Sequence, residues 1–103
     1  MSLASLSLPD LLRLRLNQVA QLSEATQRLQ KQQQTRAAAE LEAMRCELAM
    51  QNGDREELAR ELHDAQRRVE DAETERERCE ALIEVIESRL VETDREIGER
   101  TRR

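Results

Sequence analysis

The sequence predicts an all-α fold, an elongated antiparallel helical hairpin or bundle built from two long helices. The 103 residues include no Phe, Tyr or Trp and only two Gly and one Pro, and 38% of them are charged. Ala, Glu, Leu, Arg and Gln are abundant, and this composition is typical of long helices and coiled coils. Aliphatic residues recur at steps of three and four, the period of a helix. We therefore expect a single helical domain spanning residues 1–103.

The first helix is expected over about residues 9–51. It begins at Pro9, which lies between Ser7 and Asp10; proline is tolerated in the first helical turn, and an acidic residue there favours the positive end of the helix dipole. Its aliphatic stripe contains a local stutter near Gln33. The stripe comprises Leu12, Leu16, Val19, Leu22, Thr26, Leu29, Gln33, Ala37, Leu41, Met44 and Leu48.

The turn is expected at residues 52–54. Asn52 and Gly53 can adopt the positive φ that often ends a helix. Asp54 and Glu57 form an Asp-x-x-Glu capping pattern, so a second helix should begin at about residue 55.

The second helix is expected over about residues 55–92, with an uninterrupted heptad stripe that predicts a left-handed supercoil. Folding the chain at Gly53 brings together positions whose numbers sum to about 106. The stripe comprises Leu58, Leu62, Ala65, Val69, Ala72, Arg76, Cys79, Ile83, Ile86 and Leu90.

Residues 94–102 have two interpretations. Thr93 and Glu96 form a capping-box pattern, which predicts a short third helix, whereas the apolar residue Ile97 continues the stripe of the second helix. Leu82, Val85 and Val91 also widen the apolar face of the second helix. A third helix or another protein would cover this additional apolar surface.

Composition also limits the function. The net charge of -5 offers no basic footprint for nucleic acid. No segment approaches the roughly 20 apolar residues that span a bilayer, and residues 1–9 make a poor signal peptide. We expect a cytoplasmic protein that binds neither nucleic acid nor membrane.

The sequence contains no residue pattern typical of catalysis, and we expect no enzymatic activity, metal or cofactor. His63 is the one histidine, and no second ligand is spaced to join it at a metal. In the expected register Cys46 and Cys79 lie about 28 Å apart by helical rise, too far for a disulfide bond. We interpret Cys79 as a small core residue and Cys46 as a thiol on the flank of the stripe.

Leu14 interrupts the simple two-face pattern of the first helix. Residues 12–16 alternate leucine with arginine, and at 100° per residue Leu14 points well away from the stripe. It is either an ordinary exposed leucine or an apolar contact for a third helix or a partner.

Residues 12–22 resemble the start of the first helix of tubulin-binding cofactor A. There, apolar and basic residues alternate and are followed by a Val and a Leu at the positions of Val19 and Leu22. The turn at residues 52–54 is also similar. The resemblance implies a cytoplasmic, cytoskeleton-associated chaperone, a three-helix bundle that binds β-tubulin during tubulin folding and heterodimer assembly. The third helix of that family is longer than the ten residues that follow Thr93.

Two other functions fit the same pattern. The chain could be a hairpin stalk or escort protein of a bacterial secretion ATPase, or a structural coiled-coil dimer. We expect a monomer that binds a protein partner without catalysis. Helical face geometry predicts the partner-binding residues Arg13, Leu14, Arg15, Gln18 and Gln21, with Leu82 and Val85 as a second patch.

Overall fold

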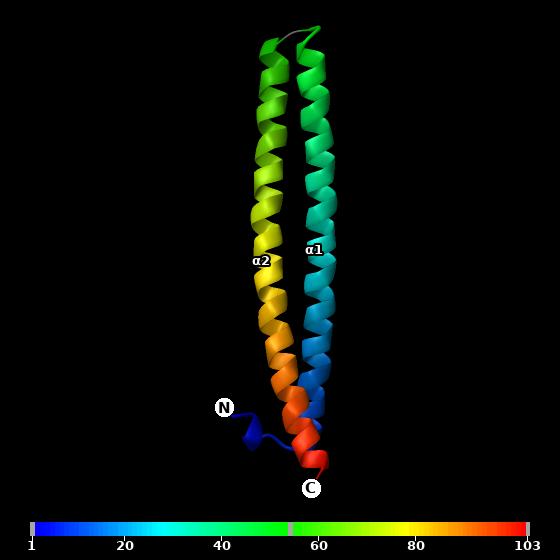
Figure 1. The fold of residues 1–103 in the computed structure, drawn as a ribbon, viewed down its shortest axis with the longest axis vertical. Helices are drawn as coiled ribbons and strands as arrows, with labels where there is room; N and C mark the ends of the chain where they lie inside the picture. Colours follow the sequence, from blue (N-terminus) through cyan, green and yellow to red (C-terminus); the bar gives the residue numbers. More distant parts are fainter. Residues whose placement is uncertain (1, 54, 103) are drawn as a thin grey trace. The chain divides into compact units, whose positions relative to one another are not determined.

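The computed structural model describes residues 2–53 and 55–102 and is all-α (Figure 1). A short 3₁₀ helix, η1 (Leu3–Ser5), precedes two long helices, α1 (Leu8–Met50) and α2 (Arg55–Thr101). The two long helices pack against each other in opposite directions. The predicted antiparallel helical hairpin is confirmed.

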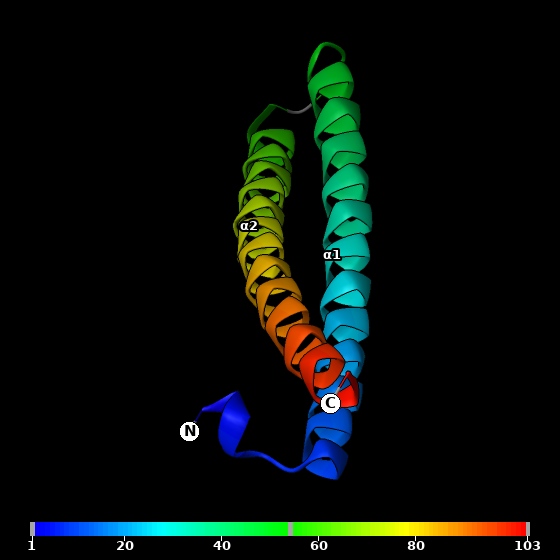
Figure 2. The same ribbon diagram turned by 60° about the horizontal axis from the view of Figure 1, so that its bottom comes forward.

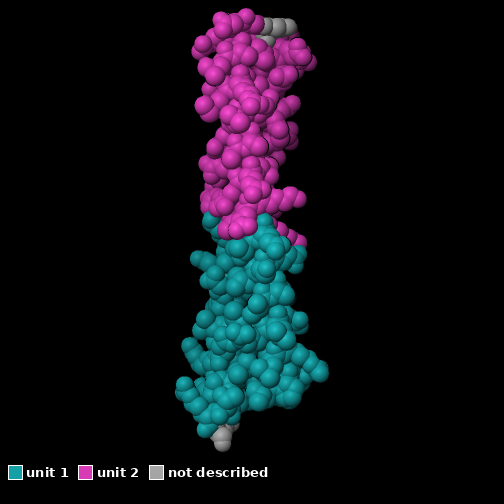
Figure 3. Space-filling view, turned by 90° about the vertical axis from the view of Figure 1, so that its right-hand side faces the viewer, with its two compact units in different colours: residues 1–27, 80–103 teal, residues 28–79 magenta. Residues whose placement is uncertain are grey.

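The hairpin divides into two compact units, which Figure 3 shows in different colours. Unit 1 joins residues 1–27 to residues 80–103, and unit 2 consists of residues 28–79. Each unit therefore contains one segment of α1 and one segment of α2.

The start of α1 follows the prediction. The Ser7 hydroxyl oxygen accepts a hydrogen bond from the backbone N–H of Asp10 at 3.3 Å, which satisfies one of the unpaired N–H groups of the first turn. Pro9 occupies the second helical position, where it removes no helical hydrogen bond.

The end of α1 differs from the prediction in its backbone conformation. No described residue, Gly53 included, has a positive φ, so the expected left-handed turn is wrong. The N–H of Asn52 instead donates to the carbonyl of Ala49 at 3.0 Å, and Gln51 bonds in the same way to Leu48. These tight bonds satisfy the last carbonyls of α1 without a left-handed residue. The expected capping role of Asp54 lies outside the described residues.

The expected short third helix at residues 94–102 is wrong, because α2 continues without a break to Thr101. Thr93 is fully buried and does not cap a new helix. Its hydroxyl donates instead to the carbonyl of Arg89 at 3.0 Å, one turn earlier in the same helix. The second interpretation, a single helix that retains Ile97 on its stripe, holds.

The predicted stripe of α2 is confirmed throughout. All ten of its residues are buried or half-buried, and the same repeat continues at Thr93 and Ile97. A strict seven-residue repeat keeps one face of a helix turned toward its partner in a left-handed supercoil.

The predicted stripe of α1 is largely wrong. Leu12, Leu16 and Val19 are exposed, as are Leu41, Met44 and Leu48, and there is no stutter. Leu22 and Leu29 of the predicted stripe are half-buried. Other buried or half-buried positions recur every seven residues and hold, apart from Leu11, small or polar side chains: Leu11, Gln18, Ala25, Gln32, Ala39 and Cys46. A set with a strict seven-residue repeat keeps facing a partner helix along the whole of α1, whereas the predicted stripe does not.

The register of the two helices also differs slightly from the expected one. In unit 1, Arg15 pairs with Asp94 at 2.6 Å, and in unit 2, Arg36 pairs with Glu73. Each partner lies three residues further along α2 than pairing numbers that sum to 106 would place it.

The N-terminal segment of unit 1 lies near the C-terminal end of α2 (Figure 2), and Arg100 bonds to it. Its guanidinium donates to the carbonyls of Leu6, Leu3 and Ala4, the last at 2.8 Å. The same side chain bonds to Glu96, one turn back in α2, at 3.1 Å. Planar guanidinium groups with several donors suit such convergent acceptors.

Candidate partner-binding surface

The residues that the sequence analysis assigned to a partner all lie in unit 1, but one of them is unavailable. Gln18 is only 6% exposed and lies in the core. Its side-chain oxygen has no hydrogen-bond partner within the described part of the chain. The assignment of Gln18 to partner binding is therefore wrong, because the register turns its position toward α2. Leu14 is half-buried at the edge of the same core.

The two arginines of this surface differ in their surroundings. The Arg13 side chain is 79% exposed and reaches Asp10 only at 3.9 Å. Arg15 donates from Nε to the Asp94 carboxylate at 2.6 Å and so connects α1 to α2. Arg13 therefore has the greater freedom to contact another molecule.

Gln21, Leu82 and Val85 are exposed in agreement with the prediction. Leu82 and Val85 are three residues apart on α2, which places them on one side of the helix, and nearly half of each side chain is accessible. They form an apolar patch that the fold does not use internally.

The structure also exposes two apolar stripes on α1 that the sequence analysis had placed in the core. The first stripe is Leu12, Leu16 and Val19 in unit 1, and the second stripe is Leu41, Met44 and Leu48 in unit 2. Leu16 and Leu48 are the most accessible of the six, at 66% and 63%. The signal was present in the sequence as a second apolar set next to the seven-residue repeat, but periodicity alone did not show which set faces α2.

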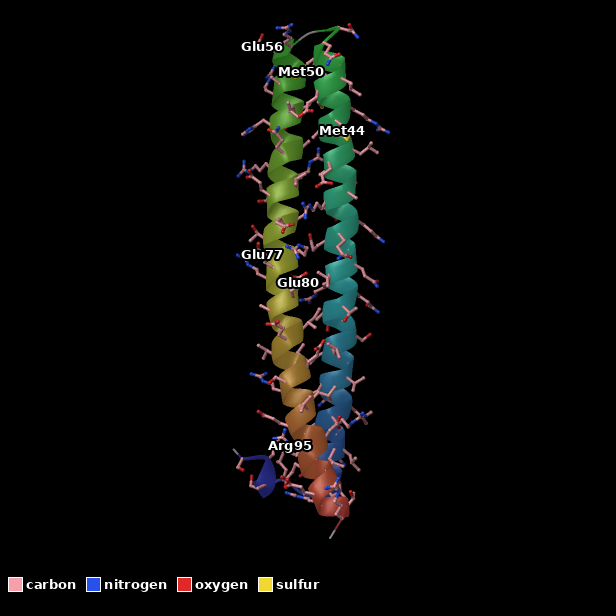
Figure 4. All side chains as sticks on the ribbon, viewed as in Figure 1. Met44, Met50, Glu56, Glu77, Glu80 and Arg95 are labelled. Atoms are coloured by element: carbon pink, nitrogen blue, oxygen red, sulfur yellow. The ribbon has the colours of Figure 1, made fainter. Side chains whose placement is uncertain are left out.

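A groove lies beside the second stripe in unit 2. It is open to solvent and has a volume of about 560 Å³. Met44, which Figure 4 labels on α1, forms part of its wall. The lining residues are Glu40, Ala43, Met44, Gln66, Val69 and Glu70. The lining thus combines three apolar side chains with two carboxylates and an amide.

A thiol and two carboxylates converge in unit 2. Cys46 is buried at 2% exposure, so its expected place on the flank is wrong. Its Sγ donates to Glu61 Oε2 at 3.9 Å, and the ligand atoms of Glu42, Cys46 and Glu61 lie within 4.8 Å of one another. Burial raises the pKa of the Cys46 thiol, and the charges of Glu42 and Glu61 raise this pKa further. The group could ligate a cation only as a thiolate, which these surroundings disfavour.

Charged residues form a network in unit 2, at the end of the unit that lies away from the turn. Glu73 accepts from Arg76 in its own helix and from Arg36 across the hairpin. The hydrogen bond from Arg76 lowers the pKa of Glu73; burial opposes this effect, and the charges of Arg36 and Arg76 add to it. The network places ionised groups at half-buried positions of the repeat.

Among the described residues, the two cysteines and His63 do not come together in one site. Cys46 and Cys79 are both free, and Cys79 lies in the core as predicted. His63 is exposed and borders a small hollow with Gln66, Arg67 and Glu70.

Comparison of the chain with protein-family models finds no matching family, and comparisons with curated proteins and with solved structures find no match either. Among the described residues, neither helix combines the length and the apolar character that crossing a membrane requires. The geometry of the two helices and their exposed apolar residues are therefore the features that bear on function.

Proposed function

We propose that this chain is a non-catalytic helical hairpin that binds another protein, and that it serves as a stalk or escort protein of a bacterial secretion ATPase. The observation that carries this choice is the uninterrupted course of α2 from Arg55 to Thr101. A hairpin of two long helices is the architecture of that class of protein, whereas the resemblance to tubulin-binding cofactor A implies three helices.

Two groups of exposed residues support binding: the apolar patch of Leu82 and Val85 on α2, and the polar residues Arg13 and Gln21 on α1. Apolar residues surrounded by polar ones are typical of protein interfaces. Because the chain is acidic overall, the affinity must come mainly from apolar contact and shape, and charge would chiefly influence the choice of partner.

A second candidate is the chaperone function, in which the hairpin binds β-tubulin during folding and heterodimer assembly in the cytoplasm. It is favoured by the run at residues 12–22, where leucine and arginine alternate before Val19 and Leu22. Tubulin is itself acidic, so the apolar residues would again have to supply most of the affinity.

A direct binding comparison tests both candidates. The full chain, immobilised, is exposed separately to a purified secretion ATPase and to β-tubulin. We expect retention of the ATPase, and we expect the double variant Leu82→Asp/Val85→Asp to abolish it. Val91→Asp is the matched control, because Val91 is also exposed on α2 but lies on another side of the helix.

The possible results separate the candidates clearly. Retention of β-tubulin alone would replace the stalk function with the chaperone function. Retention of neither protein would refute both. Circular dichroism of each variant checks that helicity is unchanged, as expected for substitutions at exposed positions.

A further inference from the structure

The two exposed stripes of α1 are spaced as mirror images of each other. In the first stripe the steps between residues are four and then three, and in the second they are three and then four. Two antiparallel helices present their residues to each other in opposite order. Either stripe, read in reverse, therefore has the spacing of the other.

We propose that these stripes form a homodimer interface, in which the first stripe of one copy packs antiparallel against the second stripe of another copy. In this pairing Leu16 contacts Met44 of the second copy, with Leu12 opposite Leu48 and Val19 opposite Leu41. Each copy offers both stripes, so the contact is reciprocal, as in a two-fold symmetric dimer.

The shapes of the two stripes fit this pairing. Leu16 is the most exposed residue of either stripe and projects as a knob. Met44 lines the open groove of unit 2 together with two other apolar residues, Ala43 and Val69. A leucine side chain that enters such a groove gains apolar contact on several sides, as knobs do in the holes of coiled coils.

The charges around the stripes are complementary as well. Residues 11–20 contain two arginines and no acidic residue, whereas residues 40–49 contain three glutamates and one arginine. Two copies of a chain with a net charge of -5 repel each other over most of their surfaces. This antiparallel pairing instead brings a basic segment to an acidic one, which favours a second copy as the occupant.

The proposal replaces the monomer expected from the sequence. That expectation assumed that the large aliphatic residues of α1 face α2, which would leave little apolar surface on α1 for association. All six residues of the stripes are instead exposed, and isolated exposed leucines are common whereas periodic sets of them mark interfaces.

Sedimentation equilibrium of the full chain over a range of concentrations tests the proposal. We expect a dimer, and we expect Leu16→Lys and Met44→Glu each to raise its dissociation constant at least about tenfold, because each buries an unpaired charge. The double variant Leu16→Lys/Met44→Glu should recover most of the affinity, since the two new charges face each other across the interface. Val91→Lys, at an exposed apolar residue outside both stripes and outside the patch of Leu82 and Val85, should leave the dissociation constant unchanged.

Three results would overturn the proposal. They are a monomer at every concentration, a dimer that Val91→Lys disrupts and Leu16→Lys does not, and a double variant that associates no better than the single ones. Circular dichroism checks that each variant remains helical. Because the partner-binding test uses Leu82 and Val85 and this one uses the stripes, either proposal can fail while the other stands.

Discussion

The two units of the hairpin use different side chains to build their cores. In unit 1, Leu11 and Thr93 are fully buried and Ile86 is nearly so. In unit 2, the buried apolar residues of the described part of the chain are Ala and Cys: Ala39, Cys46, Ala65, Ala72 and Cys79. Unit 2 adds the network of Arg36, Glu73 and Arg76 at half-buried positions.

This difference indicates how much each unit contributes to the stability of the hairpin. A fully buried large aliphatic side chain contributes roughly 1.5–3 kcal/mol, and the contribution scales with the apolar area buried, so alanine contributes less. Ion pairs that remain partly solvated contribute about 0–1 kcal/mol. Unit 1 should therefore supply more stability per fully buried residue, although each unit also leaves large aliphatic residues on its surface, as the first and the second stripe.

The largest expected effect comes from truncating the core of unit 1. Leu11→Ala should lower the free energy of unfolding by about 2–5 kcal/mol, because it leaves a cavity at a fully buried position. Cys46→Ala, at the equivalent repeat position in unit 2, should cost much less. Urea unfolding followed by circular dichroism measures both.

Leu12, the residue next to Leu11, provides the control for the comparison of Leu11→Ala with Cys46→Ala. Leu12→Ala should change the free energy of unfolding by less than about 0.5 kcal/mol in the monomer, because Leu12 is 47% exposed. Equal losses for Leu11→Ala and Leu12→Ala, measured in the monomeric Leu16→Lys background, would contradict the register of α1.

A smaller effect of opposite sign is expected at Gln18. Gln18→Leu should raise the free energy of unfolding by about 1–2 kcal/mol, because it removes a buried amide oxygen that has no partner in the described residues. Thermal unfolding measures the change. A loss of stability would show that the glutamine makes a compensating interaction, and it would weaken the contrast between the units.

Arg100→Lys should have a mainly local effect in unit 1. One ammonium group cannot donate at once to the carbonyls of Leu3, Ala4 and Leu6 in the geometry of the guanidinium fork. We expect faster amide hydrogen exchange at residues 3–11, with a loss of about 1 kcal/mol or less in global stability. Arg102→Lys, at an exposed neighbour, is the control and should leave the exchange unchanged.

The smallest expected effect is the pH dependence of unit 2. The pKa of Glu73 is below its ordinary value of 4.5 in the folded chain, so the folded state is stabilised when this carboxyl is ionised. That stabilisation is present above about pH 4.5 and is lost as the pH falls through the lowered pKa. Glu73→Gln should make the stability depend less on pH between about pH 3 and 5. Carboxyl NMR titration of the unchanged chain measures the pKa directly, and a value above 4.5 would contradict this account.

How far the fold follows from the sequence differs between the two helices. The stripe of α2 was predicted correctly because its largest apolar residues coincide with a strict seven-residue repeat. In α1 two apolar sets run close together, and most of the large side chains, though not Leu11, Leu22 and Leu29, belong to the set that faces away from α2. Choosing that set led to three linked errors: the assumed stutter at Gln33, the outward orientation of Gln18 and the failure to predict either exposed stripe.

The sequence by itself determined the all-α class, the reversal near Asn52 and Gly53, and the buried face of α2, since composition, turn residues and an unambiguous repeat are local properties. Only the tertiary structure decided which face of α1 is buried, whether residues 94–102 form a separate helix, and which apolar residues remain accessible. The reason is physical: a helix is stable with any of its faces buried, and the choice among faces depends on which side chains fit the partner helix along its whole length.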